Sequence, residues 1–150
     1  MRFNFQKIWD HGLNHPLLTF DIANVVGDVA WSPYSSTVFA AVASDGKVHV
    51  FDLFENKHDP LCVQRIVKRA KLTKVRFNSQ DYIIVVGDDK GGVNSLKLSP
   101  NLRKIHVETL DKMDKGTGNV EGGKPVMLPT LTQKEKMEVL LSSLDTKIPS

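Results

Sequence analysis

A repeat with a spacing of about 45 residues constrains the fold of this chain more than any other feature. Gly46 and Val48 of the first copy correspond to Gly91 and Val93 of the second. Within each copy, short apolar or alternating runs are separated by turn residues, which is typical of β-strands. This spacing and this density of strands are those of propeller blades. The sequence therefore predicts an all-β fold made of propeller blades.

Turn signals set the bounds of the expected strands. Asp45-Gly46 lies between two apolar runs and predicts a hairpin turn, because glycine accepts the positive φ that such a turn needs. His49 alternates with valines, so we expect it on the polar face of its strand. The expected strands cover residues 29–31, 37–42, 47–53, 61–67, 72–77, 82–86 and 93–98.

The character of the chain changes after the second copy of the repeat. Residues 1–100 hold the blades, whereas residues 101–131 combine charges, glycines and prolines without periodicity and are expected to form a flexible linker. Within residues 132–150, Thr132 and Glu135 have the spacing of a helix capping box. An amphipathic helix is expected over 133–145, with an apolar stripe made of Met137, Leu140, Leu141 and Leu144.

The stripe has three open roles. It can dock into a groove on a partner chain, fold back on an exposed blade edge, or fray, since a helix of this length is marginal alone.

Composition excludes several classes of protein. The chain has 150 residues, of which 41% are hydrophobic and 25% charged, as in an ordinary soluble domain. Cys62 is the single cysteine, so no intramolecular disulfide or cysteine-based metal cluster can form. No apolar stretch approaches the roughly 20 residues that span a bilayer, and the first residues lack the apolar core of a signal peptide. We expect a cytosolic protein that does not bind membranes.

No motif in the chain predicts catalysis, a cofactor or a metal site. The loop 85–92 is rich in glycine but lacks the residue order of a phosphate-binding loop, and we expect a hairpin turn there. Asp88 and Asp89 are expected to be solvated turn residues. The histidines and Cys62 lack metal-ligand spacing, and no serine lies in a nucleophile motif. An enzyme or nucleotide-binding protein that uses this loop is the weakest of the functional hypotheses.

A basic run without an intervening acid begins near the end of the first copy. Its simplest interpretation is a solvated outer strand and loop, and its alternative is a surface for an acidic partner. Nucleic acid is not expected, because no aromatic residues are interleaved to stack on bases. The run contains Arg65, Lys68, Arg69, Lys71, Lys74 and Arg76, and the first four are the candidate partner-binding residues.

Trp9-Asp10, and Asp45-Gly46 ahead of Phe51-Asp52, resemble the units of the WD-repeat family over residues 6 to 100. The resemblance implies about two blades and one further strand, fewer than a closed propeller needs. Trp9, Trp31, Phe51 and Phe77 are expected to lie in the core between blades, where their large aromatic area is buried in the stack of sheets. The Gly-His dipeptide of the family is missing, so Asp45 is expected to make only local turn contacts. The repeat positions are Trp9, Asp10, Trp31, Asp45, Gly46, Phe51, Asp52, Phe77 and Gly91.

Three stretches carry a closer resemblance: KIWDH at 7–11, VGDVAWSPYSSTVFAAVASDGKVHVFDL at 26–53 and IIVVGDDKGGVNSLKLSPNLRK at 83–104. They resemble the last blades of axonemal dynein intermediate chains of the outer-arm type. That family implies a non-catalytic scaffold that binds the dynein heavy chain, together with other intermediate and light chains and, indirectly, microtubules. It implies a location in the cytoplasm, the cytoskeleton and the axoneme of the cilium or flagellum. The alternative is a general WD-repeat adaptor in another cytosolic complex.

Overall fold

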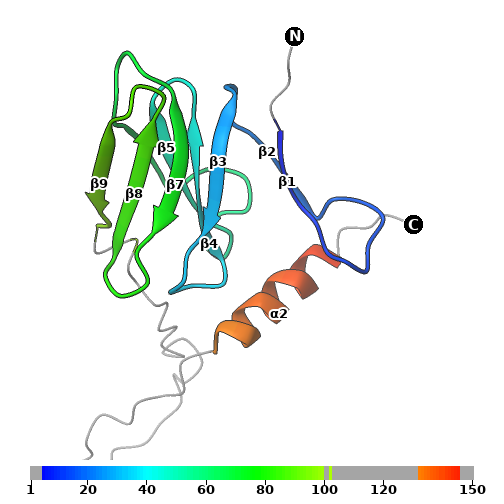
Figure 1. The fold of residues 1–150 in the computed structure, drawn as a ribbon. Helices are drawn as coiled ribbons and strands as arrows, with labels where there is room; N and C mark the ends of the chain where they lie inside the picture. Colours follow the sequence, from blue (N-terminus) through cyan, green and yellow to red (C-terminus); the bar gives the residue numbers. More distant parts are fainter. Residues whose placement is uncertain (1–4, 100–101, 103–131, 146–150) are drawn as a thin grey trace, which may run out of the picture.

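Three antiparallel β-sheets lie side by side in sequence order, with one helix against the first two (Figure 1). The computed structural model describes residues 5–99, 102 and 132–145. The first sheet pairs β1 (Phe5–Ile8) with β2 (Leu18–Asp21). The second sheet contains β3 (Val26–Trp31), β4 (Val38–Ala43), β5 (Lys47–Asp52) and β6 (Cys62–Arg65). The third contains β7 (Leu72–Phe77), β8 (Ile83–Asp88) and β9 (Val93–Lys97).

The second and third sheets repeat the same antiparallel meander. β3, β4 and β5 have their counterparts in β7, β8 and β9, and β6 adds a fourth strand to the second sheet alone. In the described part of the chain the sheets do not close into a ring. The predicted all-β fold of a partial propeller with a partly helical C-terminal segment is therefore confirmed.

One strand of the first sheet was not predicted. β2 is only four residues long and lies between turn residues, so its period-two pattern is brief. The pattern is nevertheless present, because Leu18 and Phe20 are buried while Thr19 and Asp21 are exposed. The partial blade at the start of the chain thus has two strands rather than the expected one.

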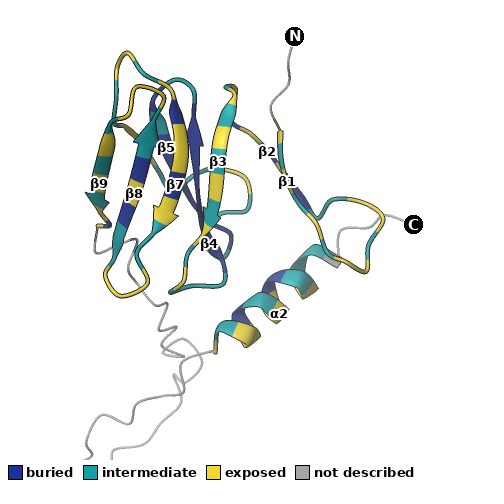
Figure 2. Cartoon of the chain, in the orientation of Figure 1, coloured by how far each residue is buried: buried dark blue, intermediate teal, exposed yellow. Residues whose placement is uncertain are grey.

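The central strand β4 is buried along its whole length and is therefore dark blue in Figure 2. Val38, Ala40 and Val42 face a cluster shared with the third sheet, which we call the first core. The alternate residues of β4 face a second core, shared with the first sheet and the helix. A strand covered on both faces reads as a continuous apolar run, which is why residues 37–42 lack polar alternation.

Aromatic rings fill the centre of the second core. The rings of Phe39 and Phe51 are stacked with centroids 4.7 Å apart, and Phe20 meets Phe39 edge-on at 5.5 Å. Aromatic pairs of this geometry contribute about 0.5–1.5 kcal/mol beyond the burial of their area. These rings join β2 to the neighbouring β4 and β5, so they hold the short first sheet in place.

Glycines occupy the two hairpin turns that the repeat predicts. Gly46 and Gly91 have φ angles of +79° and +83°, in the left-handed region. At Gly46 an added Cβ would also lie 2.1 Å from the carbonyl oxygen of Val67, whereas nothing lies within 4 Å of that position at Gly91. The first turn therefore requires glycine for two reasons and the second for one.

The helix α2 (Gln133–Asp145) has the predicted bounds. The proposed linker, residues 101–131, lies outside the described residues apart from Leu102, which packs against the first core. No helix in the described ranges is both long and apolar enough to span a bilayer.

Candidate functional site

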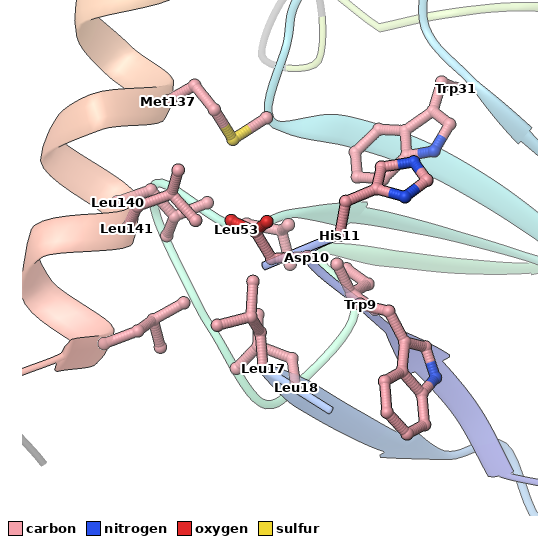
Figure 3. Close-up of a pocket in the computed structure, with 12 residues that line it drawn as sticks. Trp9, Asp10, His11, Leu17, Leu18, Trp31, Leu53, Met137, Leu140 and Leu141 are labelled. Atoms are coloured by element: carbon pink, nitrogen blue, oxygen red, sulfur yellow. The ribbon is translucent and has the colours of Figure 1, made fainter. Parts of the chain in front are cut away.

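A pocket of about 300 Å³ lies between α2 and the first two sheets. In Figure 3, Met137, Leu140 and Leu141 of the helix form one side of this pocket, while Trp9 and Trp31 stand on the other. An apolar cavity flanked by indoles suits the side chains of a binding partner better than it suits acid–base chemistry. Asp10 and His11 are the ionisable side chains among the lining residues, which also include Ile8, Leu17, Leu18, Leu53 and Leu144.

The start of α2 is capped as its sequence predicts. The hydroxyl of Thr132 accepts a hydrogen bond from the amide of Glu135 at 3.3 Å. In return, the Glu135 carboxylate accepts one from the amide of Thr132 at 2.6 Å. Two backbone donors at the helix start thus gain side-chain partners, which confirms the capping box.

Polar contacts fasten both ends of α2 to the blades. At its start, the Gln133 side chain accepts a hydrogen bond from the amide of Ser36 at 2.8 Å, and the Ser36 hydroxyl donates to the Gln133 carbonyl at 2.8 Å. Near its end, the Lys57 ammonium donates to the Ser143 hydroxyl. Between them, the buried Lys136 places its ammonium 5.9 Å from the centre of the Phe54 ring. The sequence did not predict these contacts. Their partners are 97 and 86 residues apart, and no local pattern links residues so distant in the chain.

The apolar stripe of α2 lies against the chain's own second core. Leu140 is 4% exposed, and Met137 and Leu144 are partly buried beside it. Leu141 lines the pocket. Of the three roles left open by the sequence, the structure shows the helix folded back on the blades.

Trp9 and Trp31 do not lie in the core as expected. They are 56% and 50% exposed, whereas Phe51 is 2% exposed and Phe77 is half-buried against the first core. The expectation was wrong for the tryptophans because, among the described residues, no strand pairs with the free edge of β1. Both indoles also line a second pocket of about 280 Å³, together with Gln6, Lys7, Ile8, Val29 and Phe39.

Asp45 makes a long-range contact as well as local turn contacts. Its carboxylate pairs with the Lys47 ammonium at 2.8 Å and accepts a hydrogen bond from the Asn24 side-chain amide at 3.3 Å. The expectation of local contacts alone was wrong because Asn24, in the β2–β3 loop and 21 positions away in the chain, supplies a side-chain donor. Burial raises the pKa of Asp45, but the hydrogen bonds and charge of Lys47 outweigh it, so that pKa lies below its ordinary value.

The other repeat aspartates also bind backbone or nearby hydroxyl groups. Asp10 accepts a hydrogen bond from the amide of Gly12 at 2.9 Å. Asp52 accepts one from the Thr37 hydroxyl at 2.8 Å and one from the amide of Phe54 at 3.0 Å. These carboxylates therefore stabilise turns and strand ends.

The loop 85–92 is the predicted hairpin turn. The Asp88 carboxylate accepts hydrogen bonds from the amides of Lys90 and Gly92 at 2.9 and 2.8 Å, and that of Asp89 accepts one from the amide of Lys71 at 2.9 Å. Within the described ranges, no three His, Cys, Asp or Glu residues are grouped so that they could hold a metal ion. Both carboxylates thus serve the hairpin and its link to the start of β7.

His49 is buried rather than placed on a polar face. It is 8% exposed, and its Nε2 atom has no hydrogen-bond partner in the described structure. Burial lowers the pKa of His49; the Asp45 charge opposes this shift and the Lys47 charge adds to it. The prediction was wrong because both faces of β5 are covered, the face that carries His49 also carrying Phe51.

The basic run follows the outer edge of the second sheet and the connection to β7. Arg65 lies on β6, and Lys68 and Arg69 lie in the loop that follows; Lys71 directly precedes β7. All four are exposed. Lys74 differs, because its ammonium lies 3.6 Å from the Asp28 carboxylate.

The fold and these surfaces define an open, partial propeller of the WD-repeat type, with an apolar pocket and a basic loop. No family model matches the chain. Ciliary dynein intermediate chain 2 of Heliocidaris crassispina is 63% identical over 102 residues, which cover 66% of this chain and 14% of that protein. The flagellar outer-arm 78 kDa dynein intermediate chain of Chlamydomonas reinhardtii is 57% identical over 93 residues, which cover 62% of this chain and 14% of that protein. Axonemal dynein intermediate chain 1 of Bos taurus is 58% identical over 104 residues, which cover 68% of this chain and 15% of that protein.

These identities confirm the resemblance predicted from the sequence: over about two thirds of its length the chain is homologous to axonemal dynein intermediate chains, including the outer-arm type. The matched stretch spans about one seventh of the length of these relatives, 14–15%. The names of the relatives are ciliary, flagellar and axonemal, which supports the expected location in the axoneme of a cilium or flagellum.

Proposed function

We propose that the chain is a non-catalytic scaffold subunit of an axonemal dynein complex, in which its blades bind the dynein heavy chain. The observation that carries this proposal is the identity of 57–63% to ciliary and flagellar intermediate chains. In such a role the protein performs no chemistry, and surface complementarity positions the motor for arm assembly. Other intermediate and light chains are further expected partners, and microtubules are indirect ones.

The pocket and the two exposed indoles support a binding role. Tryptophan is enriched among the side chains that dominate the energy of protein interfaces. Trp9 and Trp31 each line both pockets, so the two pockets share these half-exposed indoles and form one surface. We therefore assign this surface to the contact with the heavy chain.

The test is capture of partners from a ciliary extract on the tagged full-length chain, followed by mass spectrometry. Dynein heavy chain in near-equal amount is the expected result. The double variant Trp9→Ala and Trp31→Ala is expected to lose it, whereas the control Val93→Ala, at an exposed valine of β9, retains it.

Two results would contradict the proposal. Capture of an unrelated set of partners would favour the general WD-repeat adaptor, and capture of chaperones alone would mean that the chain does not bind the motor. Retention of heavy chain by the tryptophan double variant would place the contact elsewhere while leaving the dynein role intact.

A further inference from the structure

The loop that joins β6 to β7 is fastened at both ends. At its start, the amides of Ile66 and Val67 donate hydrogen bonds to the carbonyl of Gly46 at 2.8 and 3.3 Å. At its end, the amide of Lys71 donates to the Asp89 carboxylate at 2.9 Å, and the amide of Asp89 donates to the carbonyl of Lys71 at 2.9 Å. A loop anchored in this way presents its side chains to a partner at a lower entropic cost than a mobile one.

The loop separates its apolar side chains from its charged ones. Ile66 and Val67 pack against the first core, whereas Lys68, Arg69 and Lys71 are exposed. The apolar pair therefore holds the backbone, and the cationic groups remain available to solvent.

The positive charge of this region is not neutralised within the described structure. Arg65 lies directly opposite Lys47 in the β5–β6 ladder, an arrangement of like charges that destabilises a sheet. Lys47 is paired with Asp45, but in the described ranges no carboxylate forms an ion pair with Arg65, Lys68 or Arg69. Carboxylates of a partner would relieve this repulsion.

We infer that Arg65, Lys68, Arg69 and Lys71 form a docking surface for a carboxylate-rich segment of another protein. A protein partner is favoured over nucleic acid because residues 55–76 contain no Phe, Tyr or Trp on which bases would stack. The inference stands on the charges and anchoring of the loop, so it holds whichever complex contains the chain.

A labelled oligoglutamate peptide titrated against the full chain tests the inference directly. The expected result is saturable binding that weakens as salt is added, because exposed charge pairs are screened. Lys68→Glu with Arg69→Glu is expected to weaken binding about tenfold, since it removes two attractive charges and adds two repulsive ones. The control, Lys97→Glu with Lys134→Glu, makes the same change in net charge at two exposed residues outside both pockets, one on β9 and one on α2, and is expected to retain binding.

Carbodiimide cross-linking locates the contact independently of affinity. The expected cross-links join peptide carboxylates to Lys68 or Lys71. Equal loss of binding in both double variants would overturn the inference, because net charge rather than this loop would then be responsible. Tighter binding of an RNA oligomer than of oligoglutamate at the same salt concentration would also overturn it. Unchanged thermal unfolding of each variant shows that any loss is not due to misfolding.

Discussion

The side-chain amide of Asn24 donates a hydrogen bond to the carboxylate of Asp45, 3.3 Å away, and so joins the β2–β3 loop to the β4–β5 turn. The two residues are 21 positions apart in the chain. Asp45 also receives the amide hydrogen bond and the ammonium of Lys47. The Asp45 carboxylate therefore links the β2–β3 loop, which connects the first and second sheets, to the β4–β5 turn of the second sheet.

Replacing Asn24 with alanine is expected to destabilise the fold modestly. A net contribution of about 0.5–1.5 kcal/mol is typical for one intramolecular hydrogen bond, and a bond to a charged acceptor lies toward the upper end. The measurement is the change in the free energy of unfolding in urea. In a double-mutant cycle with Asp45→Ala, independent effects of the two changes would contradict the direct contact.

The two turn glycines are expected to respond unequally to alanine. Positive φ costs a residue with a Cβ about 1–2 kcal/mol, and this penalty applies at both positions. Gly46→Ala carries an additional penalty because its Cβ would meet the carbonyl oxygen of Val67, whereas Gly91→Ala meets open space. Urea midpoints of the two variants check the order. A Gly91→Ala variant as unstable as Gly46→Ala would show that the contact with Val67 is not important.

The stability of the protein is expected to fall as the pH decreases below about 6.5, because of His49. Burial holds the pKa of folded His49 below its ordinary value of 6.5, so the unfolded chain binds a proton at a pH where the folded chain does not. The stability contributed by neutral His49 is therefore present above pH 6.5 and lost below it. His49→Leu removes the titration and the unpartnered Nε2 atom.

Urea denaturation at several pH values between neutrality and mild acid measures this effect. The unmodified chain is expected to lose stability over that range more steeply than the His49→Leu variant. Parallel curves for the two proteins would mean that other groups are responsible for the acid sensitivity.

Truncation of Leu140 is expected to release α2 from the blades while the sheets stay folded. Leu140 is 4% exposed in the second core, and truncation of a buried leucine to alanine typically costs about 2–5 kcal/mol. A helix of 13 residues is marginal by itself, so the loss appears as local opening. Hydrogen exchange of the amides in α2 checks this, with Val139→Ala at a half-exposed valine as the matched control. Equal protection in both variants would contradict docking through Leu140.

The sequence by itself determined the strands, the turns and the helix, because these depend on local patterns. Alternation and apolar runs predicted most strands, and Thr132 with Glu135 predicted the start of α2. Glycines predicted the hairpin turns, and Gly46 and Gly91 have the positive φ angles that such turns need. The brief pattern of β2 was the exception, since four residues between turns carry little periodicity.

Only the tertiary structure decided what each face of these elements meets. Covering β5 on both sides buried His49, while the free edge of β1 left Trp9 and Trp31 exposed. The position of α2 also depends on such contacts. Gln133 of the helix bonds to Ser36, 97 residues away, and Ser143 bonds to Lys57, 86 residues away. Periodicity reports how residues alternate along an element, but burial depends on which other elements lie against it, and that depends on contacts distant in the chain.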